Sequence, residues 1–273
     1  MPKNVVILLA SLAMASACGA DDGRREQGDP TAPARPGGKT DDPVATPPVL
    51  RTRYALKVQS EVETRNTTTG ATGAYRVAVV GIAQVAQDGA HVGLSVQACR
   101  ATLPVIADRQ PTVDEATLQA LAPIVSSGTL AADGGPAWRL SLDPSAVVLG
   151  ARLTAPLTDA LPTDPTDSRV VDEDGDRKPG MSIRVSGFKV YGALRVVLSQ
   201  LAGPVGADLG VAGGAHLEPS YEIFGDSIPF FDAKAAADQA KAETEVTAQR
   251  DRFALVPVAD SATCSDVQDS LFP

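Results

Sequence analysis

The feature that most restricts the fold of this chain is the alternation of side chains between Tyr54 and Glu63. One face of this segment carries polar and charged residues, among them Lys57, Gln59 and Glu61. The opposite face carries Tyr54, Leu56, Val58, Ser60 and Val62. A period of two places successive side chains on opposite faces of a strand. The segment therefore predicts an antiparallel strand with one buried and one solvated face.

Further strand-like segments follow at short intervals. Tyr75–Ala86 and Ala90–Ala98 are joined by Asp88-Gly89, a dipeptide typical of a two-residue hairpin turn. The remaining candidates are Trp138–Leu142, Val147–Leu153, Met181–Val185, Phe188–Ser199, Ala215–Phe224 and Phe253–Val258. Such a series of short strands predicts an all-β, mainly antiparallel fold, a single barrel or sandwich domain. We favour the barrel, because the first three strands form a meander of consecutive neighbours.

Two segments have helical character. Thr112 and Glu115 match a capping box ahead of the apolar residues Leu118 and Ile124. The segment Asp232–Asp251 is rich in Ala, Lys, Gln and Glu, which favour helix. Its apolar face consists mostly of alanine, so we expect either a surface helix or a long mobile excursion. The β-domain is thus expected to carry one or two short helices.

Composition argues against two classes of binding surface. Aromatic residues are scarce (one Trp, four Tyr and six Phe), which disfavours the exposed stacking platforms that bind sugars or single-stranded nucleic acid. The net charge of −9 is unsuited to phosphate backbones, which need clustered Lys and Arg, and to a polybasic hold on anionic lipid. We therefore expect no nucleic-acid partner.

The N-terminus has the form of an export signal. Lys3 precedes an apolar run of 13 residues, Val5–Ala17, which ends in small residues before Cys18. The run is too short for a membrane-spanning helix, which needs about 20 residues. A cysteine directly after such a run resembles the lipobox of bacterial lipoproteins. This predicts a signal peptide at residues 1–17, a lipidated Cys18 with a disordered tether up to residue 49, and a β-rich domain at residues 50–273.

The resemblance implies where the protein sits. In that family the cysteine is acylated and becomes the mature N-terminus, and several acyl chains anchor a protein stably. Gly19 follows Cys18 where some lipoproteins of the inner membrane have Asp, so the outer membrane of a cell envelope is favoured over the inner one. The alternative is secretion, because Ala15-Ser16-Ala17 also fits an ordinary A-x-A cleavage site and would leave Cys18 as a free thiol.

The segment behind Cys18 has the composition of a tether. Gly, Pro, Asp, Arg and Thr dominate residues 19–49, and no apolar periodicity is present, so the segment can form no core. About 30 flexible residues have a root-mean-square span on the order of 30 Å. Such a segment lifts the folded domain away from the membrane surface.

The chain has three cysteines, Cys18, Cys99 and Cys264. If Cys18 is lipidated, the other two form an even set in an oxidising compartment. Both lie near the ends of strand-like segments. We therefore predict a disulfide between Cys99 and Cys264, with two separate buried thiols as the alternative.

An acidic segment offers metal ligands. Its alternating carboxylates at Asp172, Asp174 and Asp176 resemble the first, third and fifth positions of the calcium loops of EF-hands, dockerins and thrombospondin type 3 repeats. The resemblance implies calcium, with the backbone carbonyl of Lys178 as a further ligand. The sixth and twelfth positions depart from the pattern, because they are Arg177 and Ile183 instead of Gly and Glu.

Because of these departures, calcium would need additional carboxylates from the same region. Asp164 and Asp167 are the candidates that complete the predicted ligand set, and Glu173 is a further one. The alternative is a solvated acidic turn, since Asp, Gly and Pro are ordinary turn formers.

Evidence for catalysis is weak. His91 and His216 are the only histidines. Phe224–Ser227 resembles the first block of the GDSL lipases, but no histidine follows it to complete a triad. We expect a non-enzymatic domain with a structural or interaction role. The alternatives are a barrel that carries a small apolar ligand and, less favoured, a secreted hydrolase.

Overall fold

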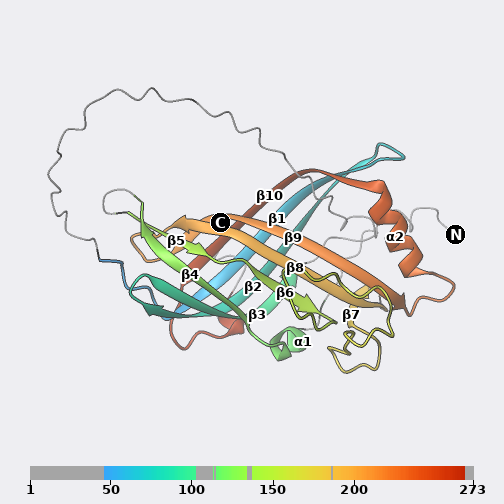
Figure 1. Ribbon diagram of the computed structural model, residues 1–273, viewed down its shortest axis with the longest axis horizontal. Helices are drawn as coiled ribbons and strands as arrows, with labels where there is room; N and C mark the ends of the chain where they lie inside the picture. The colour runs from blue at the N-terminus through green and yellow to red at the C-terminus, as the bar shows by residue number, and fades with distance from the viewer. Residues whose placement is uncertain (1–45, 103–112, 114, 134–136, 186, 268–273) are drawn as a thin grey trace, which may run out of the picture.

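The computed structural model describes residues 46–102, 113, 115–133, 137–185 and 187–267. Within these residues the chain forms one large antiparallel sheet and two α-helices (Figure 1). The strands are β1 Arg53–Asn66, β2 Thr72–Asp88, β3 His91–Thr102, β4 Ile124–Ala132, β5 Trp138–Leu142, β6 Ser145–Leu149, β7 Met181–Val185, β8 Phe188–Pro204, β9 Val211–Asp226 and β10 Thr244–Pro257. The helices are α1 Glu115–Ala120 and α2 Ala233–Glu243. The predicted all-β, antiparallel fold is confirmed.

The sheet closes on itself as a ring. Neighbouring strands follow the order β5-β4-β3-β2-β1-β10-β9-β8, and β8 pairs again with β5. The long strand β8 makes this possible, because its free edge pairs in turn with β7, then β6, then β5. Closure removes the exposed edges that an open sheet of this length would leave. The sheet thus forms a barrel, as favoured from the meander of the first three strands.

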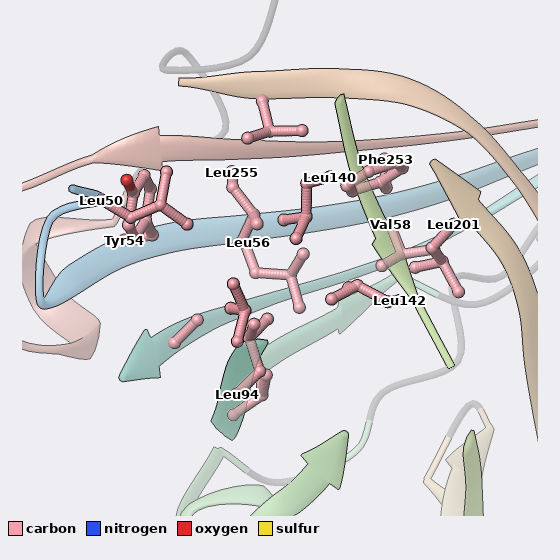
Figure 2. Packing of buried hydrophobic residues seen from close by; sticks show 14 of the residues in the cluster. Leu50, Tyr54, Leu56, Val58, Leu94, Leu140, Leu142, Leu201, Phe253 and Leu255 are labelled. Carbon is pink, nitrogen blue, oxygen red and sulfur yellow. The ribbon is translucent and has the colours of Figure 1, made fainter. Parts of the chain in front are cut away.

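One end of the barrel, the closed end, is filled by a compact core. Apolar side chains from β1, β2, β3, β4, β5, β8, β9 and β10 converge there, and Figure 2 shows residues of this cluster lying between the strands. Tyr54, at 0% exposed, is packed among them and donates its hydroxyl to the carbonyl of Leu209 at 3.0 Å. Burying this much apolar surface is the main force that stabilises the barrel.

At the opposite end of the barrel, which we call the open end, the neighbouring strands β9 and β10 separate. β9 pairs with β10 only through Val211–Gly214 and Arg252–Leu255, so beyond this point the two strands diverge. α2 connects the diverging ends and packs against β9 (Figure 1). Its buried residues are Ala233, Ala236, Ala237 and Ala240. Small side chains suit this position, because they let the helix approach the strand closely.

Two predictions from local sequence were wrong in extent. The segment expected to be helical up to Ile124 is helix only over α1, and Ile124 instead begins β4, a strand that was not expected. The helix expected to reach Asp251 ends at Glu243, and β10 follows directly. β10 pairs with β1 along nearly its whole length. This long-range pairing outweighs the helix propensity of the sequence after Glu243.

Most other strand predictions are confirmed with small shifts. β5 and β7 have the predicted bounds, and β1, β2, β8 and β9 extend the predicted segments. β3 begins one residue later than predicted, at His91, and continues to Thr102. The segment predicted as Val147–Leu153 is β6, which ends at Leu149. The segment predicted as Phe253–Val258 is the second half of β10.

A second apolar layer covers the outside of the barrel. The C-terminal segment packs on the outer face of β1, β2 and β3 through Ala262 and Val267. A β-bulge places Cys99 between Ala98 and Arg100, opposite the step from Val80 to Gly81, and Cys99 joins this outer layer. Cys99 forms a disulfide with Cys264, with the two Cα atoms 5.2 Å apart, as predicted. The remaining cysteine, Cys18, lies outside the described residues.

The disulfide is expected to contribute strongly to stability. It joins residues 165 positions apart, and in the chain-entropy model a loop of this length stabilises the folded state by about 4–5 kcal/mol. Replacing both cysteines by serine should lower the free energy of unfolding by up to that amount, measured by urea denaturation. Equal thiol counts with and without reductant in denaturant would contradict the bridge.

Candidate functional site

The inward face of the barrel can be followed along β1 from the closed end to the open end. Val58 and Phe253 lie opposite each other in the core. Two positions along β1, Ser60 lies opposite Asp251 of β10. Alternate residues of a strand share a face, so Ser60 and Asp251 also point inward. Tyr75 of β2 lies opposite the next inward residue of β1, Val62.

Asp251 and Gln249 form hydrogen bonds with the backbone of β9 where β9 and β10 diverge. The amide N–H of Leu217 donates to Asp251 Oδ2 at 2.8 Å, and Gln249 Nε2 donates to the Leu217 carbonyl at 2.7 Å. Gln249 Nε2 also donates to Asp251 Oδ2 at 2.6 Å. Two side chains thus replace the ladder bonds that β10 would otherwise make with Leu217, as buried backbone groups require.

Three buried polar atoms at this level have no hydrogen-bond partner among the described residues: Asp251 Oδ1, Ser60 Oγ and Tyr75 Oη. The side chain of Asp251 is 3% exposed. Burial, and then the charge of Asp251, raises the pKa of Tyr75 to about 12, so this phenol stays protonated at neutral pH. Buried polar groups are nearly always satisfied. The three groups lie on adjacent strands and retain hydrogen-bonding capacity that no described residue uses. We call these residues the polar cluster.

The apolar side chains around the polar cluster are incompletely buried. On β2 the inward residues Val77 and Val79 are partly exposed, whereas the outward Ala78 and Val80 are buried beneath the outer layers. The same partial exposure holds at inward positions of the facing strands, Val147 and Leu149 of β6 and Leu194 and Val196 of β8. These inward-facing aliphatic side chains remain partly accessible to water, so the interior is less tightly packed here than in the core of the closed end.

The acidic segment brings together three of the predicted ligands. One carboxylate oxygen each of Asp172, Asp174 and Asp176 lies within 4.8 Å of the others. Asp174 Oδ1 is buried and has no partner among the described residues. Arg177, at the position where EF-hand loops have glycine, adopts a left-handed conformation with φ of 66°. The backbone therefore turns as those loops do, although Arg replaces Gly.

The segment is also held by bonds that need no metal. Asp172 accepts the N–H groups of Asp176 and Arg177, and Asp176 accepts the N–H of Lys178. Lys189 Nζ lies 2.5 Å from Asp176 Oδ2. The ammonium group thus neutralises one carboxylate of the triad, as a bound cation would.

The pKa values of the triad follow from these contacts. Desolvation, followed by the nearby charge of Asp176, raises the pKa of Asp174 above its usual value. Burial acts in the same direction on Asp176, but hydrogen bonds from Lys189, Ser182 and the Lys178 backbone outweigh it, so the pKa of Asp176 is lowered. Asp174 therefore gains most from a nearby cation.

The other acidic residues of the region have partners of their own. Asp164 accepts from the backbone and hydroxyl of Thr166, and Asp167 pairs with Arg169 at 2.7 Å. Hydrogen bonds from Arg169 lower the pKa of Asp167 to about 2. Glu173 pairs with Arg152 at 2.9 Å. These three carboxylates are occupied elsewhere and do not join the triad.

The residues weighed as catalytic have local structural contacts. Asp226 accepts the backbone N–H groups of Ile228 and Ala233, and Ser227 Oγ accepts the N–H of Lys189. This segment ends β9 and leads into α2. His216 is 49% exposed, and its Nδ1 lies 3.8 Å from Asp251 Oδ2. His91 is exposed at the start of β3.

The polar cluster was not identified from the sequence. The one available signal was Ser60, a polar residue on an otherwise apolar strand face. Asp251 carried no signal, because its segment was assigned to a helix. No family model, no curated protein and no solved structure matches this chain. Among the described residues, no helix combines the length and apolar character needed to cross a membrane.

Proposed function

We propose that this protein is an exported, lipid-anchored binding module of the cell envelope, which holds a small, largely apolar molecule in the open end of its barrel. The observation that carries the proposal is the partial exposure of inward-facing aliphatic side chains at that end, exemplified by Val77 and Val79. Small-molecule sites combine an apolar lining with a few placed polar groups. The polar cluster supplies such groups.

The competing function is the structural or interaction role first expected from the sequence, without a ligand. The closed end supports it, because its core is filled by side chains that are 9% exposed or less. Both roles are non-enzymatic. The Phe224–Ser227 segment supports no hydrolase, because its polar side chains are engaged in turn and cap contacts.

The proposed location rests on Cys18 and the apolar run before it. We propose attachment to the outer membrane through an acylated Cys18, with secretion as the alternative. Replacing Cys18 by serine should move the exported protein from the membrane fraction to the soluble fraction, because the acylated residue is lost. Mass spectrometry of the mature N-terminus provides the check, and an unmodified Cys18 in the wild-type protein would contradict anchoring.

Ligand binding at the open end can be tested by filling it. In Val77→Trp the new side chain points inward and should abolish binding of a neutral apolar fluorophore, N-phenyl-1-naphthylamine. Val125→Trp is the control, since Val125 is 73% exposed on β4. Overpacking a filled core costs about 1–3 kcal/mol. Val77 is partly exposed and lies outside the compact core, so Val77→Trp should lower the free energy of unfolding by less than this. Equal fluorophore binding by both variants would contradict the proposal.

We also propose calcium as a structural ion of the acidic segment, held by Asp172, Asp174, Asp176 and the Lys178 carbonyl. The unpartnered, buried Asp174 Oδ1 and the convergence of the three carboxylates favour it. Calcium prefers six to eight oxygen ligands. Lys189 opposes binding, because its ammonium group already neutralises Asp176.

This competition predicts the effect of removing Lys189. Lys189→Met should tighten calcium binding by about tenfold, equivalent to about 1.4 kcal/mol, as measured by calorimetry. Lys178→Met is the matched control, because the Lys178 ammonium lies over the Tyr191 ring at 5.5 Å and the backbone carbonyl is retained. No heat in either variant at millimolar calcium would show that the segment is a metal-free acidic turn.

A further inference from the structure

The geometry of the polar cluster points to a ligand class. We propose that the apolar molecule bound at the open end carries a protonated amine, which donates hydrogen bonds to Asp251, Ser60 and Tyr75. This inference rests on the proposed function and specifies the chemistry of its ligand. It follows from the charge, the hydrogen-bonding capacity and the surroundings of the three side chains.

The charge of Asp251 lacks a matching cation. Buried carboxylates are normally paired, because desolvation of an isolated charge is costly. Among the described residues, the basic group within 4.0 Å of Asp251 is His216 alone, with Nδ1 at 3.8 Å, and it is charged only when protonated. The neighbouring Arg250 and Arg252 point to the other face of β10 and pair with Glu63 and Glu61 at 3.8 and 3.3 Å. A cationic ligand would supply the missing charge.

The hydrogen-bonding capacity of the cluster matches an ammonium group. Asp251 Oδ2 already accepts from Leu217 and Gln249, whereas Oδ1 accepts from no described residue. The hydroxyl oxygens of Ser60 and Tyr75 are equally unpartnered. An ammonium group has three donors and no acceptor, and each of these oxygens is able to accept a hydrogen bond. An alcohol offers one donor, and a carboxylate ligand would face the Asp251 charge.

The surroundings of the cluster fit an apolar body attached to that amine. Val77 lies directly opposite Ser60 across β1 and β2, on the inward face. Val77 and the next inward residue, Val79, are partly exposed. A ligand whose head occupies the polar cluster can therefore place its chain along these side chains and cover them. The buried apolar area would contribute about 25 cal/mol per Å².

A head-group series tests this inference separately from the proposed function. Decylamine, decanol and decanoate share one chain and differ in the head, and their affinities are measured by displacement of N-phenyl-1-naphthylamine from the full-length mature protein. We expect decylamine to bind at least about tenfold more tightly than decanol, with decanoate weakest. Comparable binding of all three would leave the proposed function intact and overturn the amine inference. Binding of none would overturn both.

Two variants assign the preference to the cluster. Asp251→Asn keeps an oxygen that can accept from the Leu217 N–H but removes the charge, and it should abolish the preference for decylamine over decanol. Asp260→Asn is the matched control, because Asp260 contacts Thr52 at an exposed position. Should Asp251→Asn fail to fold, Ser60→Val removes one acceptor and should reduce the preference several-fold. If the preference for decylamine persists in the folded variant, the assignment to the polar cluster is overturned. It is also overturned if the cluster binds only water.

Discussion

The pairing between β9 and β10 is the constraint on which the rest of this structure depends. It holds the ring together over Val211–Gly214 and Arg252–Leu255 and then stops. Beyond that point, the backbone groups on the edges of β9 and β10 that face each other need another partner or water. Asp251 and Gln249 provide partners for Leu217, and this is why a carboxylate lies at an inward position of a barrel whose other inward residues are mostly aliphatic. The end of the β9–β10 pairing leaves the backbone of Leu217 without a partner on β10, and the buried carboxylate of Asp251 supplies one.

Much of the fold was predictable from local pattern, because the barrel consists largely of strands that alternate with a period of two. The errors occur where a long-range contact decides. Ile124–Ala132 contains Ser126, Ser127 and Gly128 and has weak strand character, yet it fills the place between β3 and β5. Thr244 and Val246 are β-branched and favour strand, but the alanine-rich sequence before them masked the boundary. Pairing with β1 fixes that boundary, and a single sequence does not reveal it.

The two candidate sites differ in how far the sequence could reveal them. The acidic triad lies within five residues, so local spacing was sufficient to find it, although the role of Lys189 was not visible from 13 positions away. The polar cluster is assembled from β1, β2 and β10, which are adjacent only through sheet register. Ser60 and Asp251 are separated by nearly the whole domain in sequence. Such a cluster becomes visible only once the pairing of β10 with β1 is known.

Stability and binding are separated along the barrel axis. The closed end buries Tyr54, Leu140 and Leu255 completely or nearly so, and the disulfide fixes the outer layer on β3. With these elements supplying the packing, the open end can retain unsatisfied polar atoms and partly exposed valines that a uniformly packed domain would not tolerate. α2 borders this end with alanine alone at its buried positions, so it contributes little apolar area of its own. The packing of the closed end therefore compensates for the looser packing of the open end, and a ligand bound at the open end would add burial where the fold has least.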